Sequence, residues 1–191
     1  MLFNNTDFSS LGLPGHVAEL RRNVRDFLDN ERQKNAFKVH LGHGEFDPDF
    51  SRRVGSKGWI GMTWPRKYGG HEASYLERFV VTEELLMASA PVAAYWVADR
   101  QTGPSLLLWG TEIQRQKYMT AIAKGECYFA IGMSEPNSGS DLASVRTRAE
   151  RVSGGWKLTG QKVWTSWAHV ASAMTVLCRT SPQTDKKHEG L

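Results

Sequence analysis

The spacing of apolar residues changes near Gly125, and this change constrains the fold more than any other feature of the sequence. From Pro14 to Gly125, apolar residues recur at intervals of three and four, which places them on one face of an α-helix. After Gly125 they gather in short runs rich in β-branched and aromatic side chains, which is typical of strands. Helices followed by strands predict an α+β chain of two domains, residues 1–125 and 126–191.

Local motifs indicate where the helices of the first domain begin and end. Gly103-Pro104 is expected to separate two helices, and the glycine- and aromatic-rich stretch Gly58–Gly70 is expected to be a loop packed beneath the helices. Two motifs match capping boxes, one matches an N-cap followed by proline, and one matches a glycine stop. These motifs are Ser74-x-x-Glu77, Thr111-x-x-Gln114, Asp47-Pro48 and Lys124-Gly125.

The second domain is expected to consist of short strands. Ser153-Gly154-Gly155 is a turn signal that predicts a hairpin between two of them. No G-x-G-x-x-G motif follows a strand, so a Rossmann dinucleotide site is not expected. The strand candidates are Tyr128–Met133, Val145–Val152, Trp156–Leu158, Lys162–Thr165 and Ala173–Arg179.

Composition excludes several classes of function. The net charge of +4 comes from 24 basic and 20 acidic residues that are scattered along the chain, so we expect no nucleic-acid partner. The six histidines lack the spacing of a metal site, and no apolar run approaches membrane-spanning length, so we expect neither a bound metal nor a membrane span. Cys127 and Cys178 lie in apolar runs and predict reduced cysteines in a cytoplasmic protein.

The stretch Tyr128–Asp141 carries the strongest indication of function. An apolar strand-like run leads directly into a polar turn in which Gly139 is flanked by two serines. Without a side chain at Gly139, the backbone can approach a ligand closely. This pattern suits a flat heteroaromatic ring at the strand end and a phosphate or amide chain at the turn. The alternative is a strand followed by an ordinary serine-rich turn.

Four motifs, in this order along the chain, resemble those of the acyl-CoA dehydrogenase family. One of them begins with Ser134 where the family usually has threonine. The four motifs are Gly58-Trp59-x5-Pro65-x2-Tyr68-Gly69-Gly70, Gly110-Thr111-Glu112-x-Gln114 with Lys124-Gly125-Glu126, Ser134-Glu135-Pro136-x-x-Gly139-Ser140-Asp141, and Gly160-Gln161-Lys162-Val163-Trp164-Thr165-Ser166. The resemblance implies an N-terminal helical domain followed by an antiparallel, β-barrel-like middle domain, which is incomplete here.

The resemblance also implies FAD as cofactor and gives roles to six residues. It places one group along the pyrimidine edge of the flavin, namely Ile131, Met133 and Ser134. Trp164 matches the indole that packs against the flavin ring system, and Ser166 matches the hydroxyl at the N5–O4 edge. Ser140 matches a residue that contacts both the pyrophosphate side of FAD and the pantetheine of the acyl-CoA substrate.

Each of these residues also has an ordinary structural interpretation. Trp164, one of seven tryptophans, is on its own more typical of a core residue. Ser134 and Ser166 are also compatible with satisfying backbone groups at strand ends. Glu135 and Asp141 are expected to be structural and not catalytic, with Asp141 holding the loop. A separate pair, Arg146 and Arg148, alternates along a predicted strand and is expected to form a solvated face.

The resemblance implies α,β-desaturation of an acyl-CoA thioester, with electron-transfer flavoprotein as acceptor and a homo- or hetero-oligomer as the full-length form. The family's catalytic glutamate belongs to a C-terminal helical region, so the base is expected beyond Leu191, and this chain alone is expected to be inactive. Two alternatives remain open. One is a non-catalytic binding or assembly subunit or inactive fragment, and the other is an acyl-CoA oxidase or flavin monooxygenase on the same fold.

Overall fold

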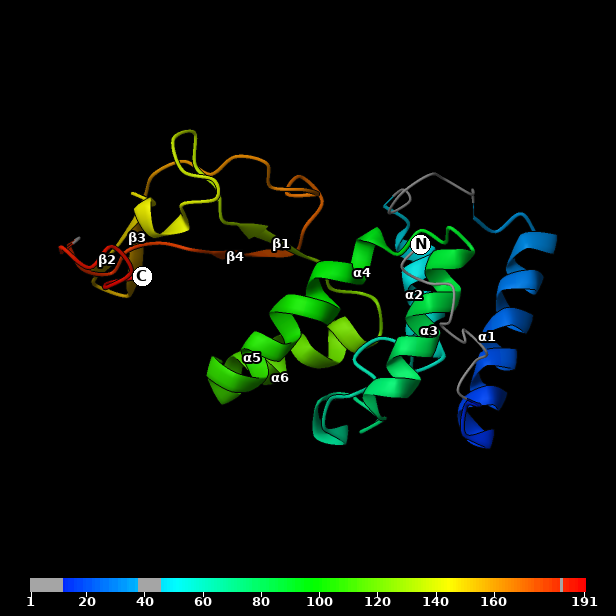
Figure 1. The fold of residues 1–191 in the computed structure, drawn as a ribbon. Helices are drawn as coiled ribbons and strands as arrows, with labels where there is room; N and C mark the ends of the chain where they lie inside the picture. Colours follow the sequence, from blue (N-terminus) through cyan, green and yellow to red (C-terminus); the bar gives the residue numbers. More distant parts are fainter. Residues whose placement is uncertain (1–11, 38–45, 183) are drawn as a thin grey trace, which may run out of the picture.

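The computed structural model describes residues 12–37, 46–182 and 184–191. Helices occupy the first part of these residues and strands the second, as the change of spacing predicted (Figure 1). The helical segments are α1 (Gly15–Gln33), α2 (Pro48–Ser56), η1 (Arg66–Tyr68), α3 (Tyr75–Met87), α4 (Ala93–Val97), η2 (Ala98–Thr102), α5 (Gly103–Trp109), α6 (Glu112–Ala123) and η3 (Leu142–Ser144). The strands are β1 (Phe129–Gly132), β2 (Arg148–Val152), β3 (Gly155–Thr159) and β4 (Ala173–Val176).

The motifs that predicted the helix ends are confirmed. Asp47 caps α2 by accepting a hydrogen bond from the amide of Phe50 at 2.8 Å. The predicted capping boxes at the start of α3 and α6 are both complete, with reciprocal side-chain and backbone bonds. Gly125 follows α6 with a φ of 72°, a left-handed conformation that glycine adopts without steric cost.

The first helix and α3 lie side by side at one end of the molecule (Figure 1). Val17, Val24 and Leu28 of α1 are buried, as their helical spacing predicted. The two helices are also joined by Arg25, whose guanidinium donates to both oxygens of the buried Glu84 at 2.8 and 2.9 Å. Such a two-bond pair fixes the relative position of the helices more firmly than a single contact would.

The stretch Gly58–Gly70 is a loop packed against the helices, as predicted. Trp64 is only 2% exposed, and its ring lies directly against Gly103 at the start of α5. The amide of Gly61 donates to the buried carboxylate of Asp99 in η2 at 2.8 Å. An apolar and a polar contact therefore hold this loop against the central helices.

The expected break between helices at Gly103-Pro104 is wrong. The helix continues from α4 through η2, a π-helical turn, directly into α5. A π turn absorbs an extra residue without ending the helix. Pro104 then lies in the first turn of α5, where a missing backbone N–H is tolerated.

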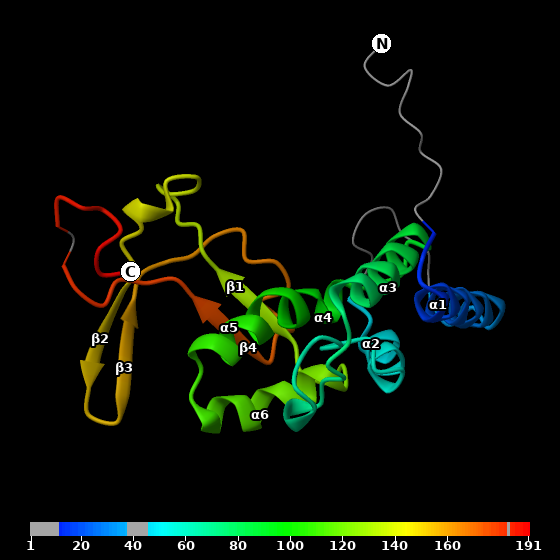
Figure 2. The same ribbon diagram turned by 60° about the horizontal axis from the view of Figure 1, so that its bottom comes forward.

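The strand region confirms the predicted hairpin but differs from the prediction in the direction of one strand pair. The expected hairpin is confirmed, because β2 and β3 pair antiparallel across the two-residue loop Ser153-Gly154. However, β1 pairs with β4 in parallel, with Phe129 opposite Ala173 (Figure 2). The long connection between them contains the hairpin and returns to the beginning of β1, so a parallel pairing results. The expectation of an all-antiparallel domain is therefore corrected.

No closed barrel is found in the part of the chain that the structure describes. Its four strands form two separate two-stranded sheets, and the β2–β3 hairpin projects away from the β1–β4 pair (Figure 2). All five residues of β3 are exposed. The segment Lys162–Thr165, which was predicted to be a strand, has no regular secondary structure.

The helical region positions the β1–β4 pair. Phe129 of β1 packs edge-on against Tyr118 of α6, with ring centroids 5.3 Å apart. The hydroxyls of Thr102, at the end of η2, and Thr175 of β4 lie 3.4 Å apart. Both strands of the pair therefore rest on the central helices, and the loop that follows β1 begins from a fixed point.

We expect Gly103→Ala to destabilise the protein. An added Cβ would lie 2.1 Å from the ring of Trp64, which is buried and cannot move aside. Overpacking of this kind costs about 1–3 kcal/mol, more than the ~1 kcal/mol that alanine gains over glycine in a helix. Urea denaturation measures the difference, with Gly15→Ala as control because its Cβ meets nothing within 4 Å. Equal stability of the two variants would contradict the expectation.

Candidate functional site

The loop after β1 is a tight turn fixed by its own hydrogen bonds. The amide of Glu135 donates to the carbonyl of Ser138 at 2.8 Å, and the amide of Ser138 donates back at 3.1 Å. The hydroxyl of Ser138 also donates to the carbonyl of Asp141. Both Glu135 and Ser138 are buried, whereas Gly139 and Ser140 are exposed. The turn therefore presents its glycine and following serine at the surface.

The carboxylate of Glu135 is the polar centre of this region. It accepts hydrogen bonds from the amides of Arg146 at 2.7 Å and Thr147 at 2.8 Å, and from Nζ of Lys162 at 2.9 Å. Burial raises the pKa of this carboxyl, but the bonds from Thr147, Arg146 and Lys162 outweigh burial and lower the pKa of Glu135 to about 2. These contacts agree with the structural role expected for Glu135.

Two of the motifs that were far apart in the sequence lie side by side. The amide of Val163 donates to the carbonyl of Ser134 at 2.9 Å. Next to this bond, Nζ of Lys162 donates to the carbonyl of Met133, also at 2.9 Å. The two adjacent bonds bring the segment that ends in Trp164 against the end of β1.

The six residues assigned by resemblance have different surroundings. Ile131 on β1 and Ser134 are half-buried, and Met133 between them is 37% exposed. Ser140 and Ser166 are exposed. The hydroxyls of Ser134, Ser140 and Ser166 form no hydrogen bond with any other described residue. The structure brings Met133 and Ser134 against Lys162 and Val163, next to Trp164 in the sequence, whereas no side-chain hydrogen bond of Ser140 or Ser166 is found among the described residues.

Trp164 does not lie in the core, which corrects the ordinary interpretation of this residue. Its side chain is 90% exposed, and its backbone has a φ of 58°. A residue in this left-handed conformation interrupts a strand, which explains why Lys162–Thr165 is irregular. Trp167 has a similar φ of 61°. Aromatic residues adopt this conformation rarely, and the strain is typical of functional segments.

Arg179 has a role that the sequence did not indicate. Its buried guanidinium donates to four backbone carbonyls, and those of Val145, Lys187 and Glu189 lie 2.8, 2.6 and 2.9 Å away. The fourth belongs to Ala143. Arg179 therefore ties the segment after the candidate loop to residues 187–189. The only signal in the sequence was a charged residue at the end of an apolar run.

Asp141 holds the loop, as expected. Its carboxylate accepts from the hydroxyl of Ser144 at 2.5 Å and from Nζ of Lys187 at 3.1 Å. The hydrogen bonds from Ser144 and Lys187 lower the pKa of Asp141 below its usual range. The loop is thus secured from both ends, through Glu135 and through Asp141.

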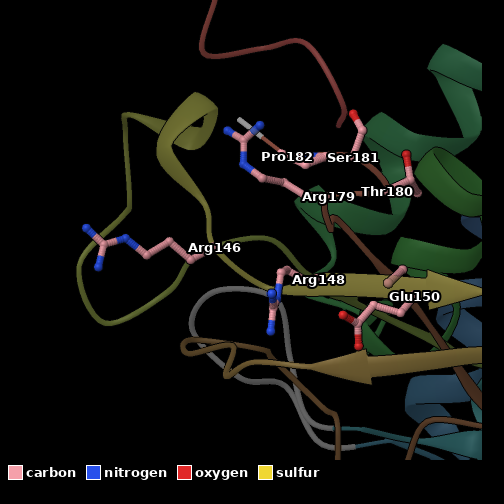
Figure 3. Close-up of a pocket in the computed structure, with 8 residues that line it drawn as sticks. Arg146, Arg148, Glu150, Arg179, Thr180, Ser181 and Pro182 are labelled. Carbon is pink, nitrogen blue, oxygen red and sulfur yellow. The ribbon is translucent and has the colours of Figure 1, made fainter. Parts of the chain in front are cut away.

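An open hollow of about 410 Å³ lies beside Arg179 (Figure 3). The exposed side chains of Arg146 and Arg148 point in different directions from its rim, so they do not converge on a common ligand (Figure 3). The guanidinium of Arg179 is already engaged by carbonyls. The hollow is therefore not a built anion site. Its lining residues are Arg146, Arg148, Ala149, Glu150, Arg179, Thr180, Ser181 and Pro182.

Residues 12–37, 46–182 and 184–191 contain neither a metal site nor a membrane-spanning helix. No group of three or more histidine, cysteine or acidic side chains there is arranged to hold a metal ion. Within the same residues, no helix combines the length and the apolar character needed to cross a membrane.

The pKa of Glu135 predicts how stability depends on pH. A carboxyl whose pKa is lower in the folded state stabilises the fold above its ordinary pKa of 4.5, and this contribution is lost as pH falls toward about 2. We therefore expect Glu135→Gln to flatten the acid limb of the stability curve. It should also destabilise the protein by about 3 kcal/mol at neutral pH, because Lys162 loses its carboxylate partner.

Urea denaturation across this pH range measures both effects. Glu150→Gln is the matched control, since Glu150 is exposed on β2 and its replacement should change stability by less than about 0.5 kcal/mol. An acid limb that keeps its slope in Glu135→Gln would show that the carboxylate is not responsible.

Two family models match the chain. The model described as acyl-CoA dehydrogenase, N-terminal domain, matches residues 16–126, and the model described as acyl-CoA dehydrogenase, middle domain, matches residues 130–191. The first match spans nearly all of the region from α1 to α6, and the second spans β2, β3, β4, most of β1 and both motif segments of the candidate site.

Curated relatives agree with this assignment. Acyl-CoA dehydrogenase FadE26 of Mycobacterium tuberculosis is 33% identical over 181 residues, covering 91% of this chain and 45% of its own length. Acyl-CoA dehydrogenase FadE29 of the same organism is 36% identical over 174 residues, with 91% and 44% covered. The chain thus spans less than half the length of these relatives.

Solved structures resemble the fold closely. The structure titled "Tcur3481-Tcur3483 steroid ACAD" has a TM-score of 0.81 and 36% identity, covering 95% of this chain and 47% of that one. The ChsE4-ChsE5 complex from Mycobacterium tuberculosis has a TM-score of 0.80 and 31% identity, with 95% and 46% covered. From these models, relatives and structures together, the chain belongs to the acyl-CoA dehydrogenase family.

Proposed function

We propose that this chain forms the flavin-facing part of an FAD-dependent acyl-CoA dehydrogenase, which introduces an α,β double bond into an acyl-CoA thioester. One observation carries the proposal. The Met133–Ser134 end of β1 and the Val163–Trp164 segment are joined by the bond between the Val163 amide and the Ser134 carbonyl. This contact places a hydroxyl and an exposed indole in neighbouring segments, as a surface for a flat ring requires.

The surroundings of the candidate residues fit a flavin. The hydroxyls of Ser134, Ser140 and Ser166 are not used by other described residues and are available to a ligand. The Trp164 ring is 90% exposed, so a ring system can pack against it. In this proposal Ile131, Met133 and Ser134 line the pyrimidine edge of the flavin.

Each polar group would have a separate task. FAD, when bound, supplies the acceptor for the β-hydrogen of the substrate. Ser166 would donate a hydrogen bond at the N5–O4 edge, which favours the electron-rich reduced ring. Ser140 would contact the pyrophosphate side of FAD and the pantetheine of the substrate. Glu135 receives no role in proton transfer, because its carboxylate is committed to three donors and its pKa is lowered to about 2.

The same proposal includes the domain organisation, the partners and the cellular compartment of the protein. We place the domain boundary at Gly125, where α6 ends, and we infer that further strands of a longer protein complete a barrel-like middle domain. The acyl-CoA substrate and electron-transfer flavoprotein as acceptor follow from the family. Cys127 and Cys178 are both free thiols, which fits a cytoplasmic protein.

A second candidate function is a subunit that supports a catalytic partner. One observation favours it. One similar structure is by its title a complex of two differently named chains, ChsE4 and ChsE5. In this alternative the flavin surface would be completed by the partner.

Titration with FAD tests the proposal. We expect only weak binding by this chain, detected as quenching of flavin fluorescence. Trp164→Ala should weaken it by about tenfold, because the stacking surface is removed. Trp156→Ala is the matched control: Trp156 is also exposed, at 55%, but lies on the hairpin away from the two joined segments, so affinity should not change. Equal loss in both variants, or no FAD binding at all, would contradict the proposal.

A further inference from the structure

The ammonium of Lys162 is buried between two acceptors from a distant segment. The side chain is 9% exposed, and Nζ lies 2.9 Å from the carbonyl oxygen of Met133 and 2.9 Å from Oε1 of Glu135. The Glu135 side chain is 8% exposed, so the ion pair is shielded from water on both sides. Bonds to charged groups in such surroundings are stronger and more strictly directed than bonds at the surface.

The aliphatic part of the Lys162 side chain passes over Gly132 to reach these acceptors. A Cβ added at Gly132, the last residue of β1, would lie 3.2 Å from Cγ and 3.5 Å from Cβ of Lys162. The aliphatic stem thus crosses the strand where the strand has no side chain. The end of β1 is therefore in contact with both the stem and the head of this lysine.

The contacts of Lys162 coincide with the junction of the two motif segments. Lys162 bonds Met133 through its side chain, and Val163 bonds Ser134 through its backbone. Two consecutive residues on one segment thus hold two consecutive residues on the other. The backbone bond alone would leave rotation about a single contact, whereas the second bond removes that freedom.

We propose that Lys162 is a positioning residue, which holds Met133 and Ser134 against Val163 and Trp164 so that the Ser134 hydroxyl and the Trp164 ring form one preformed surface for a flavin. This inference rests on the function proposed above. A surface that is ordered before binding loses less conformational entropy when the ligand binds, so Lys162 contributes to flavin affinity without contacting the flavin.

Amide hydrogen exchange tests the positioning without any flavin. In Lys162→Met the amide of Val163 should exchange at least about tenfold faster, because its bond to Ser134 is no longer held in place. Lys162→Arg, which keeps a charge that can reach Glu135, should restore most of the protection. The amides of Val80 and Val81 in α3 report the general loss of stability caused by breaking the ion pair, and the acceleration at Val163 should exceed theirs. Unchanged exchange at Val163, or equal acceleration in α3, would overturn the proposal.

FAD titration of the same variants completes the test. Lys162→Met should lower affinity about tenfold and Lys162→Arg should recover it, while Lys186→Met, which removes an exposed lysine, should bind as the wild type does. Faster exchange at Val163 together with unchanged affinity would reduce Lys162 to a purely structural role and overturn the inference. Failure of the wild type to bind FAD would instead overturn the proposed function, and the exchange result would still decide whether Lys162 holds the segments together.

Discussion

The buried carboxylate of Glu135 is the interaction on which the candidate site depends. Its oxygens accept from the amides of Arg146 and Thr147 and from Nζ of Lys162, so one side chain joins three segments of the chain. A buried carboxylate must be neutralised or fully hydrogen-bonded, and here the same three donors both satisfy the charge and fix the loop. The site is therefore built around an internal ion pair and not around an apolar core, which the small strand region does not provide.

The helices provide the other constraint, because they fix the point from which the loop starts. Trp64 packs against Gly103, and the carboxylate of Asp99 accepts a hydrogen bond from the amide of Gly61. These two contacts hold the π turn between α4 and α5. Tyr118 then positions Phe129 at the start of β1. The path from the core to the site is thus continuous through packed residues. The β2–β3 hairpin is held at its base, where the amide of Ala149 donates to the carbonyl of Arg179 at 2.7 Å, while its Trp156 and Leu158 are exposed.

Features that depend on local chemistry could be predicted from the sequence. The capping boxes at Ser74 and Thr111 and the hairpin at Gly154 are set by neighbouring residues, and all are confirmed. The structural role of Glu135 was also expected, although its three donors were not. The parallel pairing of β1 with β4 and the buried roles of Lys162 and Arg179 depend on residues 27 to 44 positions away. No pattern within a short window contains that information, because the partners of Lys162 and Arg179 lie on other segments of the chain.

The two sides of the candidate site differ in stability, and this difference bears on how a ligand could bind. On the β1 side, Ser134 lies two residues after the end of the paired strand and leads into a loop secured by Glu135. On the other side, Trp164 combines a left-handed backbone with an indole that is 90% exposed. A left-handed conformation costs an aromatic residue roughly 1–3 kcal/mol, and an exposed indole forgoes the stabilisation of burial. The second cost is recovered when a ligand covers the ring, whereas the backbone strain is already present before binding. A flat ligand that stacks on Trp164 while bonding to the fixed β1 side would therefore gain affinity by burying an indole that the free protein already holds in place.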